Sequence, residues 1–164
     1  MSIAHRMIAA RKIRTFWSSG PDGRAMFAEA FFLPLLISAG FRLAGVPRTQ
    51  AALRRWSAAF PKPDSRVPHA VILDAVRAQR TIRRTLKIGG SCLVRSLSLW
   101  ALLLRRGIPT DLRVGYRKKD GAMEGHAWLE YAGNPINEEP AVAGTYCVQE
   151  NLVAFDRSLA RLAR

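Results

Sequence analysis

The spacing of apolar residues predicts that the first half of the chain is helical. Residues 25–59 carry apolar positions three and four apart, such as Leu53 and Trp56, and predict one or two helices. Three prolines in residues 61–68 predict a linker or a tight crossing. An apolar stripe over residues 69–86, with most arginines off it, predicts a further helix.

The second half begins with the strongest helical pattern and continues as strands. Residues 91–106 have leucines on one face, Ser91 in position to cap the start and Gly107 to end the helix. The stretches "TDLRVGYRK", "EGHAWLEY" and "INEEP" predict three strands, separated by the turn sequences "KDGA" and "AGNP". The chain is therefore predicted to be an α+β protein, with a basic helical region over residues 1–68 and a core over residues 69–164.

The most apolar run, residues 30–41, is predicted to be a buried or interfacial helix. It has twelve residues, Pro34 interrupts it, and Glu29 abuts it. A membrane-spanning helix needs about 20 apolar residues, and no clear cleavage site for a signal sequence follows the run. We therefore expect no membrane span. Residues 25–59 could dock a partner protein or rest on a membrane surface, and membrane contact is the less expected of the two.

The formal net charge of +14 is concentrated before Cys92. Residues 1–91 carry 16 Lys and Arg against 4 Asp and Glu, whereas residues 92–164 carry 10 against 8. A basic half favours an acidic partner, which can be a peptide, a protein, a membrane surface or a nucleic acid. Because this half lacks the interleaved aromatic residues of a stacking platform, we expect no nucleic acid partner.

Cys92 is the candidate nucleophile, because it stands where the predicted helix 91–106 begins. The positive end of a helix dipole favours the thiolate, and the unpaired N–H groups there can bind an oxyanion. A small buried core residue would fit the same position. Cys147 has no such context and is predicted to be a packed thiol. Two cysteines are too few for a disulfide scaffold, so we expect a reducing, cytoplasmic location.

His126 is the candidate general base. Alternation in "EGHAWLEY" puts His126 and Trp128 on one face of a strand, which a hairpin can bring beside the helix start. The imidazole would accept the thiol proton and later protonate a leaving amine, unless it only packs beside Trp128. For the group that orients it, Glu138 is the first choice, Glu139 the reserve and Asn137 the weaker option, with an ordinary solvated acidic turn as the alternative.

Two stretches, "SCLVRSLSLWALLLRRGIPTDLRVGYRK" and "EGHAWLEYAGNPINE", resemble the lasso-peptide leader peptidases. The order, spacing and flanking residues agree over about residues 88–139. The motif cysteine is Cys92 and the motif histidine is His126. The family's third residue, usually an aspartate, falls twelve residues later on Glu138. The resemblance implies a transglutaminase-like or papain-like core, in which the cysteine helix packs on a small antiparallel sheet bearing the histidine and the acid.

The resemblance also implies a mechanism and roles for nearby residues. Cys92 would attack the peptide carbonyl at the junction of leader and core. The oxyanion would lie near the Cys92 N–H and a second donor, for which Gln79 is the candidate. Arg95 would steady a carboxylate or the incoming peptide, unless it is simply solvated. Trp128 would either wall the site or fill the core.

The implied partners are a precursor leader peptide, a separate leader-recognition protein and an ATP-dependent macrolactam cyclase. The residues before Cys92 show no run of short strands, so the recognition domain is expected on another chain. The chain has no Gly-rich phosphate loop, because "GG" at 89–90 only breaks a helix, and its Cys and His spacing is unlike a zinc site. We therefore expect neither a cofactor nor a metal, and assign any ATP dependence to the cyclase.

Three alternatives to a cysteine protease stay open at this point. One is a non-catalytic peptide-binding module of the same fold. Another is an acyl transferase that uses an amine in place of water. The last is a nucleic-acid binder, which the basic half motivates and whose binding would weaken steeply with salt.

Overall fold

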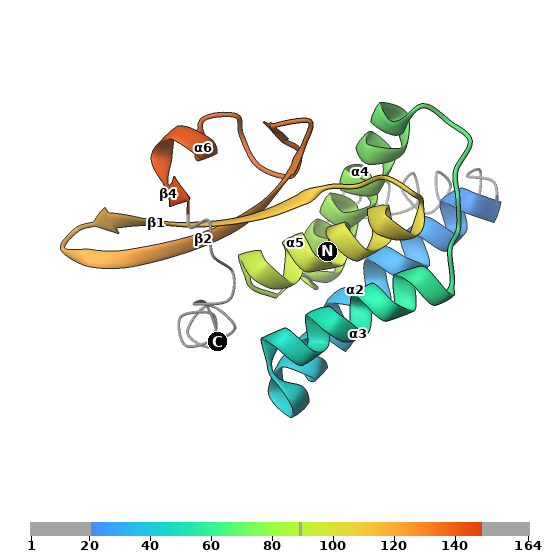
Figure 1. Ribbon diagram of the computed structural model, residues 1–164, viewed down its shortest axis with the longest axis horizontal. Helices are drawn as coiled ribbons and strands as arrows, with labels where there is room; N and C mark the ends of the chain where they lie inside the picture. The colour runs from blue at the N-terminus through green and yellow to red at the C-terminus, as the bar shows by residue number, and fades with distance from the viewer. Residues whose placement is uncertain (1–20, 89, 149–164) are drawn as a thin grey trace, which may run out of the picture.

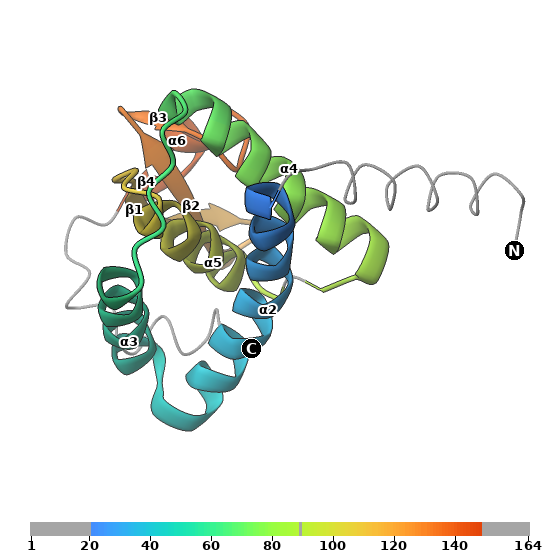
Figure 2. The same cartoon turned by 90° about the vertical axis from the view of Figure 1, so that its right-hand side faces the viewer.

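A central helix, α5, separates the other long helices from a small sheet (Figures 1 and 2). The computed structural model describes residues 21–88 and 90–148. In chain order the elements are α2 (Pro21–Ala44), α3 (Val46–Ala59), α4 (Pro68–Leu86), α5 (Cys92–Arg105), β1 (Asp111–Lys119), β2 (Ala122–Tyr131), β3 (Asn134–Pro135), α6 (Val142–Thr145) and β4 (Cys147–Val148). The predicted α+β class is therefore confirmed, as are the helices predicted over residues 25–59, 69–86 and 91–106. The first 20 residues of the predicted basic helical region lie outside the described residues.

Helix α5 is buried on nearly all sides. Its leucines contact α2, α3 and α4, and its other side packs on β1 and β2. Leu93, Leu97, Leu99 and Leu103 are each at most 1% exposed. A helix that is apolar around most of its circumference has to lie inside the protein, since each exposed leucine forfeits about 1.5–3 kcal/mol of burial. The helix that carries Cys92 is thus held in place by buried contacts along most of its length.

The sheet is antiparallel, with strand order β3-β2-β1-β4. Strands β1 and β2 form a hairpin around Asp120 and Gly121, whose φ angles are 50° and 81°. Positive φ at both central residues is the geometry that Asp-Gly turns supply. The predicted "KDGA" turn is therefore confirmed. In this register Gly115 of β1 lies opposite His126 of β2.

The predicted third strand is wrong in its position. The strand is Asn134–Pro135, and "INEEP" continues as a bend. The Asn137 Oδ1 accepts a hydrogen bond from the N–H of Leu129 at 2.8 Å. A side chain thus takes the place that a backbone carbonyl would occupy in a longer ladder. The backbone turns away from the sheet at that point, so the acidic residues after Asn137 are carried by a bend.

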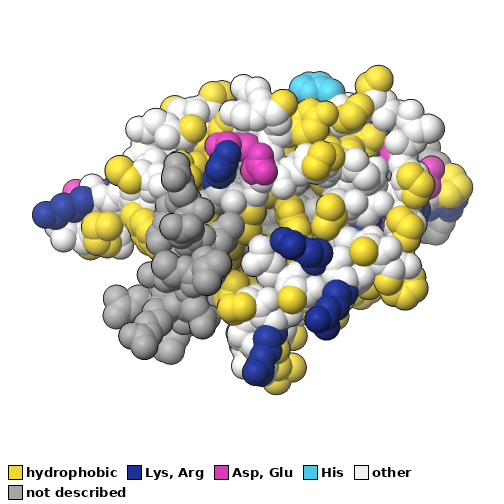
Figure 3. Space-filling model, in the orientation of Figure 1, with side chains coloured by type: hydrophobic (Ala, Val, Ile, Leu, Met, Phe, Trp, Pro, Cys, Tyr) yellow, Lys and Arg dark blue, Asp and Glu magenta, His cyan; other side chains and the backbone are white. Residues whose placement is uncertain are grey.

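Helix α2 runs through Pro34 without a break, contrary to the prediction that this proline interrupts the segment. Its core face carries Met26, Leu33 and Ile37, while Leu36 and Leu43 are among its exposed apolar residues. On length and composition alone, with a mean hydropathy of 1.5, α2 would suffice to cross a membrane, and 28% of that window is buried. Figure 3 shows apolar and basic side chains side by side over the part of the surface that α2 and α3 form.

The first helices share one buried cluster with the rest of the fold. Met26 and Ile37 from α2 and Leu53 from α3 belong to the same core as the leucines of α5. The carboxylate of Glu29 joins α2 to the end of α5 by accepting hydrogen bonds from Arg105 at 2.7 Å and from Arg106 at 2.6 Å. The division of the chain at residue 68 stays a prediction.

Replacing Glu29 should destabilise the fold strongly, because the Arg106 side chain is only 2% exposed and would lose its charged partner. We expect Glu29→Ala to lower the free energy of unfolding by about 3 kcal/mol, measured by urea denaturation. Asp22→Ala is the control, since Asp22 is 80% exposed and lies 3.9 Å from Lys62. That variant should lose less than about 1 kcal/mol. Equal losses in the two variants would contradict a buried ionic link.

Candidate active site

Cys92 lies in the first turn of α5, and the residue before it caps the helix. The Ser91 Oγ accepts a hydrogen bond from the N–H of Val94, and the Ser91 carbonyl accepts one from the N–H of Arg95. The predicted N-cap is therefore confirmed. Helix geometry provides no intrahelical acceptor for the N–H groups of Cys92 and Leu93. These two donors are available to a negatively charged oxygen near the sulfur.

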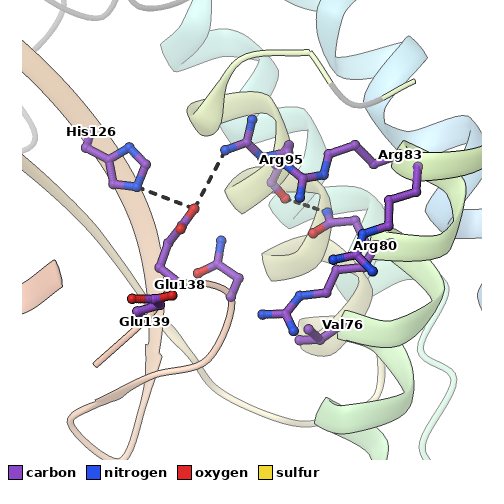
Figure 4. A pocket seen from close by; sticks show the side chains of 10 residues that line it. Val76, Arg80, Arg83, Arg95, His126, Glu138 and Glu139 are labelled. Carbon is purple, nitrogen blue, oxygen red and sulfur yellow. Dashed lines mark hydrogen bonds and ion pairs between the residues drawn. The ribbon is translucent and has the colours of Figure 1, made fainter. Parts of the chain in front are cut away.

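The imidazole of His126 reaches Cys92 from strand β2. Its Nε2 lies 3.4 Å from the Glu138 Oε1, and Figure 4 shows the two side chains pointing toward each other. The ring also interacts with the Cys92 thiol, and this interaction lowers the pKa of the thiol and raises that of the imidazole. Because Nε2 faces the carboxylate, Nδ1 is the ring nitrogen left for the sulfur. The structure thus brings together the three residues that sequence reasoning placed first.

Glu138, and not its neighbours, faces the histidine. Glu139 is exposed and lies on the rim of the same cavity. Asn137 points the other way, into hydrogen bonds with Leu129 and Ser96. Among the three candidates considered from the sequence, the geometry therefore selects Glu138.

The protonation of these groups is coupled. Burial raises the pKa of the Cys92 thiol, but the hydrogen bond with His126, the N–H of Ala127 and the charges of His126 and Arg95 outweigh it, and the net pKa is lowered. Hydrogen bonds to Cys92 and then to Glu138 raise the pKa of His126 to about 9, against its burial. The lowered pKa of the thiol and the raised pKa of the imidazole both favour a thiolate beside an imidazolium, which is the reactive form of a cysteine nucleophile.

The pKa of the Glu138 carboxyl is lowered for matching reasons. The hydrogen bond with His126 has the largest effect, and the charges of His126, Arg95 and Arg83 add to it against burial. Glu138 is therefore ionised at neutral pH. A negative charge here holds the imidazole in one orientation and stabilises its protonated form.

A small polar network docks helix α5 on the sheet beside the site. The Ser96 Oγ donates to the Ala127 carbonyl at 2.9 Å and accepts from the Asn137 Nδ2 at 3.0 Å. Ser96 is completely buried, one turn after Cys92. Ala127 follows His126, and Asn137 precedes Glu138. The network therefore joins the three segments of the chain that carry Cys92, His126 and Glu138.

The structure places Arg95 and Gln79 on the helix side of the cavity. Nη2 of Arg95 lies 3.6 Å from Oε1 of Glu138, so that carboxylate lies between a guanidinium and the imidazole. The Gln79 Nε2 donates to the Arg95 carbonyl at 2.8 Å, which ties α4 to α5. One hydrogen of the Gln79 amide group is engaged there, and an amide carries two. Its suggested role as an oxyanion donor stays a prediction.

Aromatic rings hold the histidine from behind. Trp128 is fully buried and donates from Nε1 to Glu130, and its ring stacks near His126 with centroids 6.2 Å apart. The Tyr146 ring stacks on His126 at 5.2 Å, and the Arg117 guanidinium lies over the Tyr146 ring at 4.8 Å. These rings restrict the imidazole to the orientation that meets both partners. The structure places Trp128 in the core, behind the histidine.

Sequence reasoning missed Tyr146, because β4 is only two residues long and shows no alternation. The residue that could have indicated a close neighbour here is Gly115, which the hairpin places opposite His126. A Cβ at Gly115 would lie 2.8 Å from the Tyr146 Cβ and 3.2 Å from the Trp128 ring. That glycine lets the segment before β4 come close to the site. The packed-thiol prediction for Cys147 is wrong, because Cys147 is exposed on this edge strand.

Over residues 21–88 and 90–148, no three His, Cys, Asp or Glu side chains group in a way that could hold a metal ion. The chemistry available from the residues present is that of an activated thiol. A nucleophile, a general base and an orienting carboxylate are in place, with helix N–H groups nearby for an oxyanion.

A helix-borne cysteine, followed in the chain by a histidine on an antiparallel sheet and by a carboxylate, defines the papain-like and transglutaminase-like class of thiol sites. A family model of the transglutaminase-like superfamily matches residues 35–149, and the chain belongs to this superfamily. No curated protein and no solved structure matches the chain. The superfamily includes both cysteine proteases and acyl transferases.

An activated thiolate should make Cys92 react quickly despite its partial burial. In a Cys147→Ser background, we expect iodoacetamide to alkylate Cys92 at neutral pH about tenfold faster than it alkylates a Cys147→Ser, His126→Ala variant. A free cysteine, with a pKa of about 8.5, becomes protonated and unreactive below that pH. The alkylation rate of Cys92 should stay high at pH values where a free cysteine has already lost its reactivity. Intact-mass spectrometry over time measures both rates. The thiolate–imidazolium pair would be disproved by equal rates in the two variants.

The polar network predicts a linked loss of stability and thiol reactivity. Asn137→Ala leaves the Leu129 N–H and the Ser96 hydroxyl each without one partner, so we expect a loss of about 1–3 kcal/mol in the free energy of unfolding. Alkylation of Cys92 should also slow. Asn134→Ala is the matched control, because the exposed side chain of Asn134 donates a local hydrogen bond to the Ala132 carbonyl two residues away. A loss in both variants alike would show that the network does not set the site.

Proposed function

We propose that this protein is a cysteine protease that removes the leader peptide from a ribosomally made lasso-peptide precursor. The observation that carries the protease part is the grouping of Cys92, His126 and Glu138, in which the imidazole interacts with the thiol and lies 3.4 Å from the carboxylate. The nature of the precursor is carried by the resemblance of the sequence around Cys92 and His126 to the leader peptidases.

In the proposed reaction, the Cys92 thiolate attacks the carbonyl carbon at the junction of leader and core. The carbonyl π pair moves to oxygen, and the resulting oxyanion lies near the N–H groups at the start of α5. When the tetrahedral intermediate collapses, the C–N bond breaks and His126 gives its proton to the leaving amine. The leader then remains on Cys92 as a thioester.

The second half of the reaction uses the same groups in reverse. The neutral His126 removes a proton from water, and the resulting hydroxide attacks the thioester carbonyl. The C–S bond breaks, and the leader leaves as a carboxylic acid. Cys92 and His126 return to the thiolate–imidazolium pair. Glu138 stays ionised throughout and holds the ring between its two tasks.

The partners belong to the same proposal. A separate recognition protein would hold the leader, and an ATP-dependent cyclase would close a macrolactam ring on the released amine. The reducing surroundings that this thiol chemistry needs fit a cytoplasmic location. The charge of the chain, +14 overall, would favour acidic stretches in these partners.

An acyl transferase is the second candidate, because the superfamily includes such enzymes and the same thioester can react with an amine. The two reactions differ in product mass. After hydrolysis the summed masses of the two fragments exceed the mass of the precursor by one water, whereas after transfer they exceed it by the mass of the amine. Mass spectrometry of a reaction in isotopically labelled water decides between them, because only hydrolysis puts the label in the new carboxylate.

Cleavage of a candidate precursor should depend on the triad in a graded way. With the recognition protein present, we expect Cys92→Ala to reduce the cleavage rate by at least about 10⁴-fold and Glu138→Gln by about 10²- to 10⁴-fold. Glu139→Gln should have a much smaller effect, because that side chain does not face His126. Chromatography of the fragments measures the rates. Cleavage that survives Cys92→Ala, with precursor binding unchanged, would rule out the protease.

A further inference from the structure

A cavity of about 380 Å³ opens beside His126 and Glu138, and its far wall is basic. Figure 4 shows Arg80 and Arg83 on the α4 side and Arg95 on the α5 side, with His126, Glu138 and Glu139 across the cavity. Arg84 also lines it. The two helices therefore present four guanidinium groups to a space that adjoins the proposed reaction centre.

Among the described residues, the protein pairs one of these four arginines with a carboxylate and leaves the other three without one within ion-pair distance. Arg95 pairs with Glu138, which His126 also contacts. Across residues 21–88 and 90–148, no carboxylate lies within ion-pair distance of Arg80, Arg83 or Arg84. The cavity thus holds an excess of positive charge, because only Glu138 and Glu139 contribute carboxylates to its wall.

The clustered arginines also repel one another within α4. Arg80 stands three and four residues before Arg83 and Arg84, so the three share one helix face. Like charges at this spacing destabilise a helix by a few tenths of a kcal/mol per pair. An anion bound among them would relieve that repulsion. Guanidinium groups pair well with carboxylates, because two parallel N–H donors match the two carboxylate oxygens.

We propose that the cavity is a subsite for an acidic side chain, Asp or Glu, of the peptide substrate, within a few residues of the scissile bond. This inference rests on the proposed function, since it assumes a peptide at Cys92. A single carboxylate fits a cavity of this size and charge. A nucleic acid backbone fits less well, because Glu138 and Glu139 line the opposite wall of the cavity and would repel a run of phosphates.

The subsite acts on substrate selection, so its effect is read as a preference between peptides that the same protein cleaves. A peptide with Glu at the selected position should be preferred over the same peptide with Lys by about 10- to 100-fold in kcat/KM, because a charge-assisted hydrogen bond is replaced by repulsion. Gln should fall between them. The preference should weaken at high salt, since the arginines of α4 are exposed to solvent.

The test uses the full-length chain and a peptide set based on a candidate precursor. Each of about four positions on either side of the scissile bond is in turn Glu, Gln or Lys. The proposal expects one position at which the unaltered protein prefers Glu, and at which Arg80→Glu with Arg83→Glu reverses the preference toward Lys. Arg54→Glu with Arg55→Glu is the control, because it changes the net charge equally on exposed residues of α3.

The outcomes separate this inference from the proposed function. If peptides are cleaved but no position shows a charge preference, or if both double variants change it alike, the subsite is overturned while the protease stands. If no peptide is cleaved, binding of the same fluorescent peptides to Cys92→Ala protein reports on the subsite alone, and equal binding of Glu and Lys peptides overturns it. Should the double Glu variant not fold by circular dichroism, Arg80→Gln with Arg83→Gln must abolish the preference.

Discussion

The site depends on the hydrogen bonds of one buried serine. Ser96 links the carbonyl of Ala127 on β2 to the side chain of Asn137 after β3, inside the buried contact between α5 and the sheet. Hydrophobic packing brings helix and sheet together but does not fix how far one slides on the other, because it lacks direction. Directional bonds within a buried contact do fix it, since a shift would leave polar groups unpaired.

With that register fixed, the electrostatics follow from position. The thiol lies at a helix start, the imidazole lies beside it, and a carboxylate lies behind the imidazole. Burial opposes every charge in this group, and it is outweighed because each charge has an opposite partner. Tyr146 and Trp128 then limit the motion of the ring, so that the proton is exchanged between fixed atoms.

The same arrangement connects the chemistry to the basic character of the chain. Arg95 serves the carboxylate of the triad, and the arginines of α4 extend positive charge from there into the adjoining cavity. Activation of the thiol and the proposed binding of an acidic peptide would thus use neighbouring groups of one surface. The exposed apolar side chains of α2 lie on a different part of the molecule and make no contribution to it.

The sequence by itself determined the local structure that carries the chemistry. Ser91 and the leucines after it define α5 and put Cys92 in its first turn, and the Asp120–Gly121 turn defines the hairpin that bears His126. These features follow from interactions between residues close in the chain. Only the tertiary structure decided that Glu138 and not Glu139 faces the histidine, and that Tyr146 packs on it. Those outcomes depend on where the backbone leaves the sheet at Asn137 and on the close approach at Gly115, which are contacts between distant segments.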